Sequence, residues 1–134
     1  MRLLLDTHIF LWLHTERKRL GEHLSLLEDP QTERLFSAAS SWEIAIKYAL
    51  ARLPLPEPPQ HYVPSRMRAI GATALPIEHS HALAVAALPP LHGDPFDRLL
   101  VAQAGLLDVP ILTADAAIAR YPVRTLLIGA AARP

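Results

Sequence analysis

The 134-residue sequence contains no cysteine, so disulfide bonds and thiolate metal sites are excluded. Lysine plus arginine and aspartate plus glutamate each number 13, which leaves a formal net charge of zero. The molecule therefore has no overall basic field, and a nucleic-acid partner would have to be held by a local patch or by a metal ion. The sequence also lacks the GxSxG, Walker A and GxGxxG motifs, so acyl transfer and nucleotide switching lack their usual residues.

No apolar run is long enough to cross a membrane. Near the N-terminus the run Leu3–Leu5 is cut by Asp6 after three residues, which is unlike a signal peptide. Hydrophobic residues make up 51% of the chain and charged residues 19%, a composition that argues against disorder. We expect a single domain over residues 1–134, with a substantial core, in a soluble cytoplasmic protein without a membrane partner.

Short apolar runs alternate with segments of helical periodicity along the chain. The run Leu3–Leu5, ended by a polar residue, is typical of a buried parallel strand. In the segment 40–52, Trp42, Ile46 and Leu50 recur at i+4 spacing, which predicts a helix. The remaining predictions are strands at 34–37, 72–75, 110–112 and 123–127, helices at 9–13, 20–27, 62–70, 78–87, 95–107 and 115–120, an extended proline-rich connector at 54–59 and a loop at 89–93. This alternation predicts an α/β fold with a parallel sheet covered by helices on both faces.

Four carboxylates lie where such a fold joins strands to helices. Asp6 follows the first strand, and Asp115 follows the strand 110–112. Glu43 and Asp97 lie near the starts of two predicted helices. Each has an ordinary explanation, since Asp6 and Asp115 are suitable helix caps, Glu43 completes a capping-box pattern, and Asp97 falls in a first turn that favours negative charge. Taken singly, each acid is adequately explained as a cap.

Taken together, the four acids are better explained by a binding site. In open α/β sheets, ligands bind at the carboxyl ends of the strands, at a topological switch point. Carboxylates that converge there repel one another, a cost that a helix cap does not require. Mg²⁺ and Mn²⁺ prefer oxygen ligands and relieve such repulsion. We therefore predict that Asp6, Glu43, Asp97 and Asp115 form one acidic, metal-binding site.

Several polar residues adjoin these acids. Asp94 precedes Pro95, which suits the first position of a helix, so Asp94 is predicted to cap that helix. Thr7 and Thr113 could orient a carboxylate or a metal-bound water, or they could simply close a strand. Arg98 is placed to meet a phosphate, or else to pair with a neighbouring acid. The predicted substrate-binding residues are Arg98, Thr7 and Thr113.

Other chemically capable residues are predicted to have ordinary roles. His79 and His81 are two residues apart and face different sides of a helix, which makes a poor zinc chelate, so surface or loop roles are predicted for them and for His92. The basic run 17–19 is predicted to be a solvated loop. Core or interface positions, rather than base-stacking platforms, are predicted for most of Trp12, Trp42, Tyr48 and Phe96.

Four segments carry a resemblance to a known family, in order along nearly the whole chain. They are LLDTH at 4–8, SSWEIAIK at 40–47, HGDPFDRLLVAQA at 92–104 and LTAD at 112–115. They resemble the PIN domain, and most closely the VapC-type toxins of bacterial and archaeal toxin–antitoxin pairs. The match extends from Leu3 to about Leu127, and DPFDRLL is its most specific part.

The resemblance implies a three-layer α/β/α fold with a parallel five-stranded sheet and the acids at one edge. It implies a Mg²⁺- or Mn²⁺-dependent endoribonuclease that cleaves RNA with metal-activated water. It also implies a homodimer and a cognate VapB-like antitoxin whose C-terminal segment covers the active site. By position, Asp6, Glu43, Asp97 and Asp115 match the family's acidic quartet. Asp6 and Asp97 are predicted to bind the metal directly, and Asp115 either directly or through water. Glu43 either binds the metal or acts on the attacking water. Asp94 matches an accessory acid.

Two other functions remain open at this point. A receiver-like signalling domain also gathers acids around Mg²⁺ at a sheet edge, but such domains carry a lysine late in the chain. The last lysine here is Lys47, which counts against that function. A non-catalytic module that docks a basic partner segment in the acidic site is not excluded by any motif.

Overall fold

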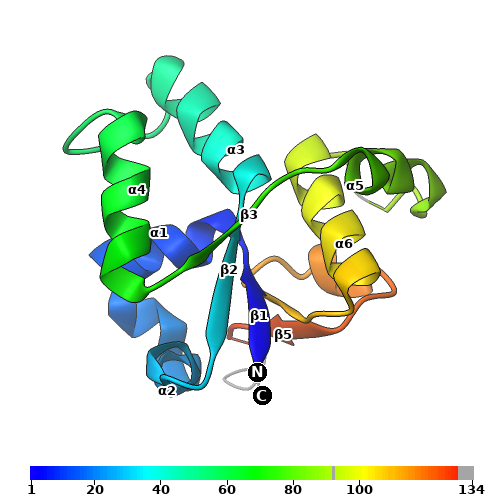
Figure 1. The fold of residues 1–134 in the computed structure, drawn as a ribbon, viewed down its shortest axis with the longest axis horizontal. Helices are drawn as coiled ribbons and strands as arrows, with labels where there is room; N and C mark the ends of the chain where they lie inside the picture. Colours follow the sequence, from blue (N-terminus) through cyan, green and yellow to red (C-terminus); the bar gives the residue numbers. More distant parts are fainter. Residues whose placement is uncertain (92, 130–134) are drawn as a thin grey trace.

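The computed structural model of the chain describes residues 1–91 and 93–129, and in these residues a parallel five-stranded sheet forms the centre (Figure 1). The strands are β1 (Arg2–Leu5), β2 (Glu33–Ser37), β3 (Thr73–Leu75), β4 (Ile111–Thr113) and β5 (Thr125–Leu127). They lie in the order β3-β2-β1-β4-β5, and each neighbouring pair is parallel. The predicted parallel sheet is thereby confirmed.

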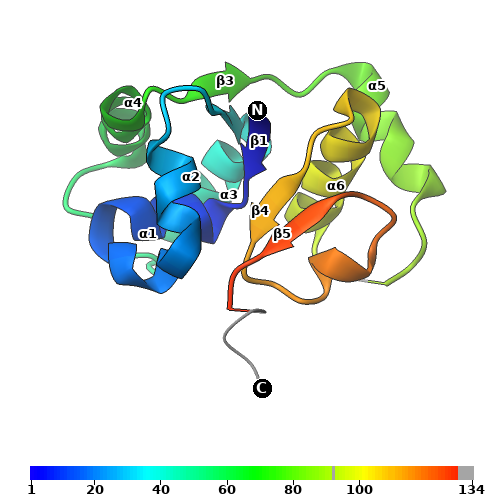
Figure 2. The same cartoon turned by 90° about the horizontal axis from the view of Figure 1, so that it is seen from below.

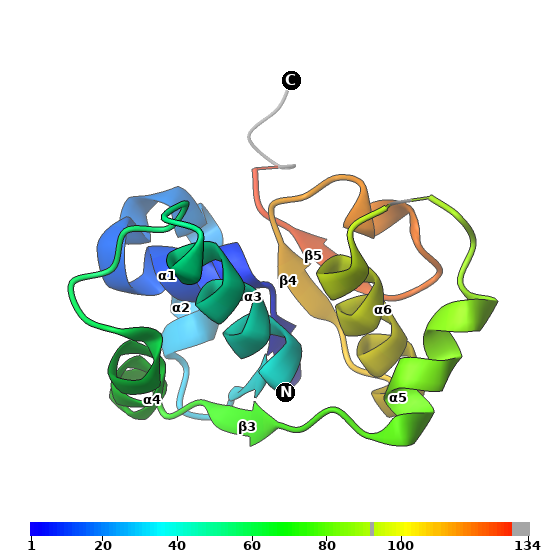
Figure 3. The ribbon, with the colours of Figure 1, turned by 90° about the horizontal axis from the view of Figure 1, so that it is seen from above.

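Helices cover both faces of the sheet (Figures 2 and 3). The helices are α1 (Thr7–Thr15), α2 (Leu24–Glu28), α3 (Ala38–Ala49), α4 (Pro59–Ile70), α5 (His79–Ala84) and α6 (Pro95–Leu107), with short 3₁₀ helices η1 (Arg17–His23), η2 (Val85–Ala87) and η3 (Ile118–Arg120). Helices α1, α2 and α4 lie on one side, α5 and α6 lie on the other, and α3 packs against both α4 and α6. The three-layer α/β/α fold is as predicted.

Strand β1 is buried on both faces, which explains its continuous apolar sequence. Leu3 and Leu5 pack in a cluster with residues of α1 and α2, such as Ile9. Leu4 faces the opposite side and packs in a cluster with Leu100 of α6. Each of these leucines is fully buried, which stabilises the fold by about 1.5–3 kcal/mol per side chain.

The strand order contains one topological switch point, between β1 and β4. The chain proceeds from β1 to β2 and β3 in one direction, and it returns to add β4 and β5 on the other side of β1. Because the strands are parallel, their carboxyl ends share one edge of the sheet, and α1 and α3 begin there. Ligand sites in open α/β sheets form at this kind of edge.

Helix α3 begins earlier than its sequence predicts. Ser37 ends β2 and also caps α3, because its Oγ accepts a hydrogen bond from Ala39 N at 3.0 Å. The predicted capping box of Ser40 and Glu43 is therefore wrong, since both residues lie inside the helix and are buried.

The i+4 stripe of apolar residues that predicted α3, which includes Trp42 and Leu50, faces outward. Trp42 is 55% exposed and Leu50 is 58% exposed, whereas Ile44 on another face of the helix is fully buried. Trp42 is therefore not a core residue, although its ring makes an edge contact with Phe96, with ring centres 5.0 Å apart. The i+4 stripe predicted the helix correctly, but not the face that the sheet covers.

Other boundaries also differ from the prediction: helix 9–13 extends over Thr7–Thr15, helix 78–87 is divided into α5 and η2, and only η3 forms within 115–120. The predicted helix 20–27 is divided between η1 and α2, because Gly21 has a φ of 54° that a helix cannot contain. Helix α4 begins at Pro59 rather than at Tyr62, since proline is favoured in the first turn of a helix. No helix within the described ranges 1–91 and 93–129 combines the length and the apolar character of a membrane span.

Candidate functional site

A cavity of about 550 Å³ opens at the edge of the sheet where α1 and α3 begin. Its lining comes from strand ends, helix starts and one loop, namely Asp6, His8, Trp12, Arg19, Glu43, Lys47, Asp94, Asp97, Ala114 and Asp115. All four acids predicted from the sequence line this cavity, and so does Asp94. The fold thus brings together carboxylates that are up to 109 positions apart in the sequence, from Asp6 to Asp115.

Asp6 and Asp115 come from the two strands at the switch point, and one hydroxyl links them. Thr113 Oγ1 donates a hydrogen bond to Asp6 Oδ2 at 2.6 Å and accepts one from Asp115 N at 3.0 Å. Thr7 N donates to Asp6 Oδ1 at 2.7 Å, so Asp6 caps α1 as well as lining the cavity. Thr113 is fully buried, and its hydroxyl therefore fixes where both acids lie.

Glu43 is held by contacts that have no role in capping a helix. Thr7 Oγ1 lies 2.6 Å from Glu43 Oε1 and 2.8 Å from Ser40 Oγ. Because a threonine hydroxyl carries one proton, Thr7 donates to the carboxylate and accepts from Ser40. Lys47 Nζ donates to Glu43 Oε2 at 2.6 Å, one helical turn further on. Both carboxylate oxygens of this buried acid are thus positioned by the protein.

Asp94 and Asp97 divide two roles at the start of α6. Asp94 Oδ1 accepts hydrogen bonds from Phe96 N at 2.8 Å and Asp97 N at 3.2 Å, so Asp94 caps the helix as predicted. Pro95 occupies the first turn, where its missing N–H costs nothing. Asp97 lies in this first turn, is 9% exposed, and lines the cavity.

Asp97 experiences the combined charge of the other acids. Burial has the largest effect, and the charges of Asp6, Asp94, Glu43 and Asp115 add to it, so that the pKa of Asp97 is raised to about 8. Four separate carboxylates therefore influence this one group. The cavity favours a positive charge, either a proton on Asp97 or a cation close to it.

The pKa values of two neighbouring groups, Asp6 and Lys47, are also raised in the acidic cavity. Burial raises the pKa of Asp6, although the hydrogen bond from Thr113 works against this shift. The pKa of Lys47 is raised, mainly because it donates a hydrogen bond to Glu43. The lysine therefore remains charged and serves as a fixed positive partner within the acidic cavity.

The donor set fits a divalent cation that keeps part of its water. Carboxylate oxygens of Asp6, Asp97 and Asp115 line one cavity, and hard cations prefer such ligands. In residues 1–91 and 93–129, no group of three or more acidic or histidine side chains lies close enough together to hold a metal ion by itself. Mg²⁺ commonly takes one or two carboxylates and completes its shell with water and phosphate, so an open set of acids suits it.

A model of the PIN-domain family matches residues 3–123, which include every acid of the cavity. The chain belongs to the PIN-domain family. Ribonuclease VapC16 of Mycobacterium tuberculosis is 47% identical over 62 residues, which are 46% of this chain and 44% of that protein. The matched region thus spans less than half of the relative.

Solved structures share the fold of this PIN domain. VapBC2 from Rickettsia felis, bound to a DNA fragment, has a TM-score of 0.73 at 15% identity and covers 96% of this chain and 99% of its own. DNA-bound VapBC from Salmonella typhimurium has a TM-score of 0.65 at 16% identity and covers 94% and 97%. At these identities the likeness supports the fold alone. The resemblance to the PIN domain seen in the sequence is confirmed.

Five lining residues of the PIN domain were not predicted from the sequence as site residues: His8, Trp12, Arg19, Lys47 and Ala114. Lys47 follows Glu43 by four residues, a spacing at which an acid and a lysine meet on one helix face, so a signal for it existed. His8 and Trp12 are likewise four apart. Arg19 had no such signal. Residues 17–19 are solvated as predicted, but they lie in η1 rather than in a loop, and Arg19 lines the cavity.

Arg98 lies outside the lining of the cavity. Its Nη1 donates to Pro89 O at 3.0 Å and to Tyr121 Oη at 3.1 Å, and its Nη2 donates to Val85 O at 3.2 Å. These contacts tie the segment before α6 to the end of η3. The predicted contact between Arg98 and the substrate stays a prediction.

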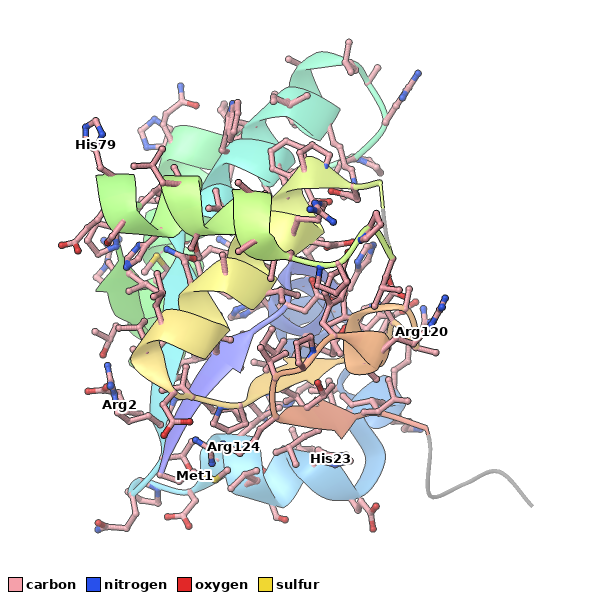
Figure 4. All side chains as sticks on the ribbon, turned by 90° about the vertical axis from the view of Figure 1, so that its right-hand side faces the viewer. Met1, Arg2, His23, His79, Arg120 and Arg124 are labelled. Carbon is pink, nitrogen blue, oxygen red and sulfur yellow. The ribbon has the colours of Figure 1, made fainter. Side chains whose placement is uncertain are left out.

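The histidines of α5 differ from each other in burial. His81 is buried, and its Nδ1 lies 3.2 Å from Gln103 Nε2 of α6, so the surface or loop role predicted for it is wrong. The surface role holds for His79, which projects from α5 at the edge of the molecule (Figure 4). His92 lies outside the described residues.

Proposed function

We propose that this PIN-domain chain is a metal-dependent endoribonuclease that hydrolyses RNA phosphodiester bonds. The observation that carries the proposal is the convergence of acids on Asp97, whose pKa the neighbouring charges and burial raise to about 8. A site that only needed helix caps would not gather carboxylates from two strands and two helices in one cavity. The partial identity with a protein named Ribonuclease VapC16 supports RNA as the substrate.

The residues divide into metal-binding, positioning and water-activating roles. Asp6, Asp97 and Asp115 would hold Mg²⁺ or Mn²⁺. Such a cation, when bound, lowers the pKa of a water molecule and polarises the phosphoryl oxygens. Thr7 and Lys47 fix the two carboxylate oxygens of Glu43 at the cavity wall, so we assign Glu43 to orienting the attacking water. No side chain attacks the phosphate covalently in this scheme.

Two threonines act through these acids. Thr7 holds one oxygen of Glu43 by its hydroxyl, and Thr113 holds one oxygen of Asp6. The sequence interpretation placed both near the substrate. Because both are buried and already bonded to carboxylates, we now assign them to positioning the acids.

The function is tested by incubating the purified chain with a panel of structured and unstructured RNAs in Mg²⁺, in Mn²⁺ and in chelator. We expect cleavage with either metal, none in chelator, and a restricted set of cut ends after mapping. Binding of a basic peptide without cleavage of any RNA would instead support the non-catalytic docking module.

Metal-free protein is expected to lose stability as the pH rises, and Mg²⁺ is expected to restore it most at higher pH. The pKa of Asp97 is raised from 3.8 to about 8, so the folded protein holds a proton that the unfolded chain has released. This contribution is complete below the unfolded pKa and is lost as the pH passes the folded one. Burial of His14 lowers its pKa from 6.5 to about 4, which acts in the opposite direction but only below its unfolded pKa.

The measurement is thermal unfolding at about pH 7 and about pH 8.5, with chelator and with Mg²⁺, because His14 no longer contributes there. We expect the midpoint in chelator to fall by a few degrees over this interval, and Mg²⁺ to raise it more at the higher pH. An Asp97→Asn variant cannot titrate at this position and should show a smaller fall. Equal falls in both proteins would contradict the role given to Asp97.

We further propose that the chain is the toxin of a toxin–antitoxin pair, with a VapB-like antitoxin as its partner. The acidic cavity suits a basic segment of such a partner, and the fold is shared with chains in VapBC structures. We expect a small reading frame with a DNA-binding N-terminal half to precede the gene, and its product to inhibit cleavage when the two are mixed. An isolated gene would count against this partner but not against the nuclease.

A homodimer is also proposed. Large apolar side chains lie exposed on α3, directly after it and on α5, where Trp42, Leu50 and Leu83 are 55%, 58% and 73% exposed. A second copy of the chain would cover such side chains, and sedimentation of the purified protein measures whether it does.

A further inference from the structure

One wall of the acidic cavity is built from side chains that are not acids. His8 and Trp12 lie one turn apart on α1 and therefore share a face of that helix, and Arg19 reaches the same wall from η1. Trp12 is half-buried and packs against the core cluster that contains Leu13. We call these three residues, His8, Trp12 and Arg19, the aromatic wall.

The side chains of the aromatic wall contact one another and a neighbouring carboxylate. The guanidinium carbon of Arg19 lies 4.0 Å from the centre of the Trp12 ring, and Arg19 Nη1 donates to Glu16 Oε2 at 2.9 Å. The His8 and Trp12 ring centres are 6.1 Å apart. Arg19 is thus held by a ring and by a carboxylate, although its side chain is 56% exposed. A long, exposed arginine side chain normally samples many rotamers and loses entropy when a ligand fixes it. Because Arg19 is already held in place, its planar guanidinium loses less entropy when a planar partner stacks on it.

The composition of the cavity limits what its other walls can bind. Five carboxylates line it, and they repel the phosphates of an RNA strand except where a cation intervenes. Arg19 and Lys47 are the cations among its lining residues, and Lys47 is paired with Glu43. Contacts that do not depend on negative charge would therefore add to the affinity for the rest of the strand. Unpaired bases supply such contacts, because they stack on aromatic rings and on guanidinium planes.

We propose that His8, Trp12 and Arg19 form a nucleobase-binding subsite, in which a base next to the scissile phosphate stacks against the aromatic wall. The proposal rests on RNA being the substrate, as argued above, and it names the contact that selects an unpaired strand. It reverses the sequence-based interpretation of Trp12 as a core or interface residue rather than a stacking platform.

General attraction between the basic residues of η1 and RNA is the simpler alternative, and the chain offers a matched control for it. Lys18 lies next to Arg19 in η1 and carries the same charge, but it does not line the acidic cavity. Arg17 is less suitable, since it pairs with Glu28 and donates to Leu13 O. Lys18→Ala therefore removes the same charge from the same 3₁₀ helix without touching the aromatic wall.

The chain's tryptophan content permits a direct binding assay. Trp12 and Trp42 are its two tryptophans, and Trp42 is exposed on α3, outside the cavity. A Trp42→Phe protein therefore reports on Trp12 alone. We would titrate it, in chelator to prevent cleavage, with a short oligoadenylate and with an abasic ribose-phosphate oligomer of the same length.

We expect the oligoadenylate to change Trp12 fluorescence and to bind about tenfold more weakly to Arg19→Ala and Arg19→Lys. We expect the Lys18→Ala control to lose less than about twofold. The abasic oligomer should bind weakly to all four proteins, because it keeps the phosphates but has no base to stack. The Arg19→Lys variant keeps the charge, so its loss separates stacking from attraction.

Equal binding of the abasic oligomer, or equal losses in Arg19→Ala and Lys18→Ala, would overturn the subsite. Cleavage assays separate this failure from failure of the proposed function. If the Arg19 variants cut RNA in Mg²⁺ with unchanged kcat/KM, the subsite is wrong and the nuclease stands. If Trp12 reports stacking of a base and no RNA is ever cut, the nuclease is wrong while base binding at the wall remains.

Discussion

An Asp97→Asn variant is expected to lose RNA cleavage by about 10³-fold while keeping its fold. The asparagine side chain is close to isosteric with aspartate, but it would offer one neutral oxygen where the cavity now presents a carboxylate to a cation. Metal ions contribute several kcal/mol of transition-state stabilisation, and each 1.36 kcal/mol corresponds to tenfold in rate. The loss is measured as kcat/KM on one RNA substrate in Mg²⁺, with circular dichroism as the check on folding.

The same variant should be more thermally stable than the native chain when metal is removed. Burial and four neighbouring carboxylates disfavour the charged form of Asp97, as its raised pKa of about 8 indicates, and asparagine has no charged form. Loss of activity together with a higher unfolding midpoint would identify Asp97 as a functional residue that costs stability. Loss of activity with a lower midpoint would point to damage of the fold.

Asp94 provides the matched control for Asp97. Both are aspartates at the start of α6, but Asp94 accepts hydrogen bonds from the backbone N–H groups of Phe96 and Asp97. Asparagine caps helices about as well as aspartate, so Asp94→Asn should keep the cap and most of the activity. Equal losses at both positions would show that general negative charge, rather than ligation by Asp97, supports cleavage.

The sequence predicted the layers of this fold because its strongest signals are local. The apolar run of β1 indicates a buried strand, and the Asp94-Pro95 pair indicates the start of a helix. Both elements appear as predicted. The start of α3 was misplaced for a physical reason. Ser37 ends β2 and caps α3 at once, with no loop between them, and a local pattern cannot reveal where sheet pairing stops.

The acids of the site were predictable because topology alone brings strand ends to one edge. Their supporting residues were less accessible from the sequence. Lys47 gave a recognisable spacing with Glu43, but the same spacing is common on solvated helices, so only burial of the acid distinguishes it. Arg19 reaches the cavity through a bend at η1, and its contact with Trp12 depends on tertiary structure. The aromatic wall therefore became visible only in three dimensions.

A Thr113→Val variant is expected to lower cleavage by about 10- to 100-fold, although Thr113 contacts no substrate in the proposed scheme. Its hydroxyl donates to Asp6 Oδ2 at 2.6 Å and accepts from Asp115 N at 3.0 Å, so valine would remove a partner from the Asp6 carboxylate and from the backbone N–H of Asp115. The hydrogen bond from Thr113 also opposes the upward shift of the Asp6 pKa, so the shift should grow in the variant.

The readout is the pH at which cleavage reaches half of its maximum, together with the Mg²⁺ concentration that it requires. Because Asp6 would hold its proton to higher pH, both values should rise in Thr113→Val, whereas purely structural damage would lower the maximal rate without moving either. Thr113→Ser keeps the hydroxyl and should restore both values. Thr125→Val on β5 removes a hydroxyl that donates to Val123 O, away from the cavity, and should change neither. If the serine variant behaves like valine, packing of the methyl group rather than the hydroxyl positions Asp6.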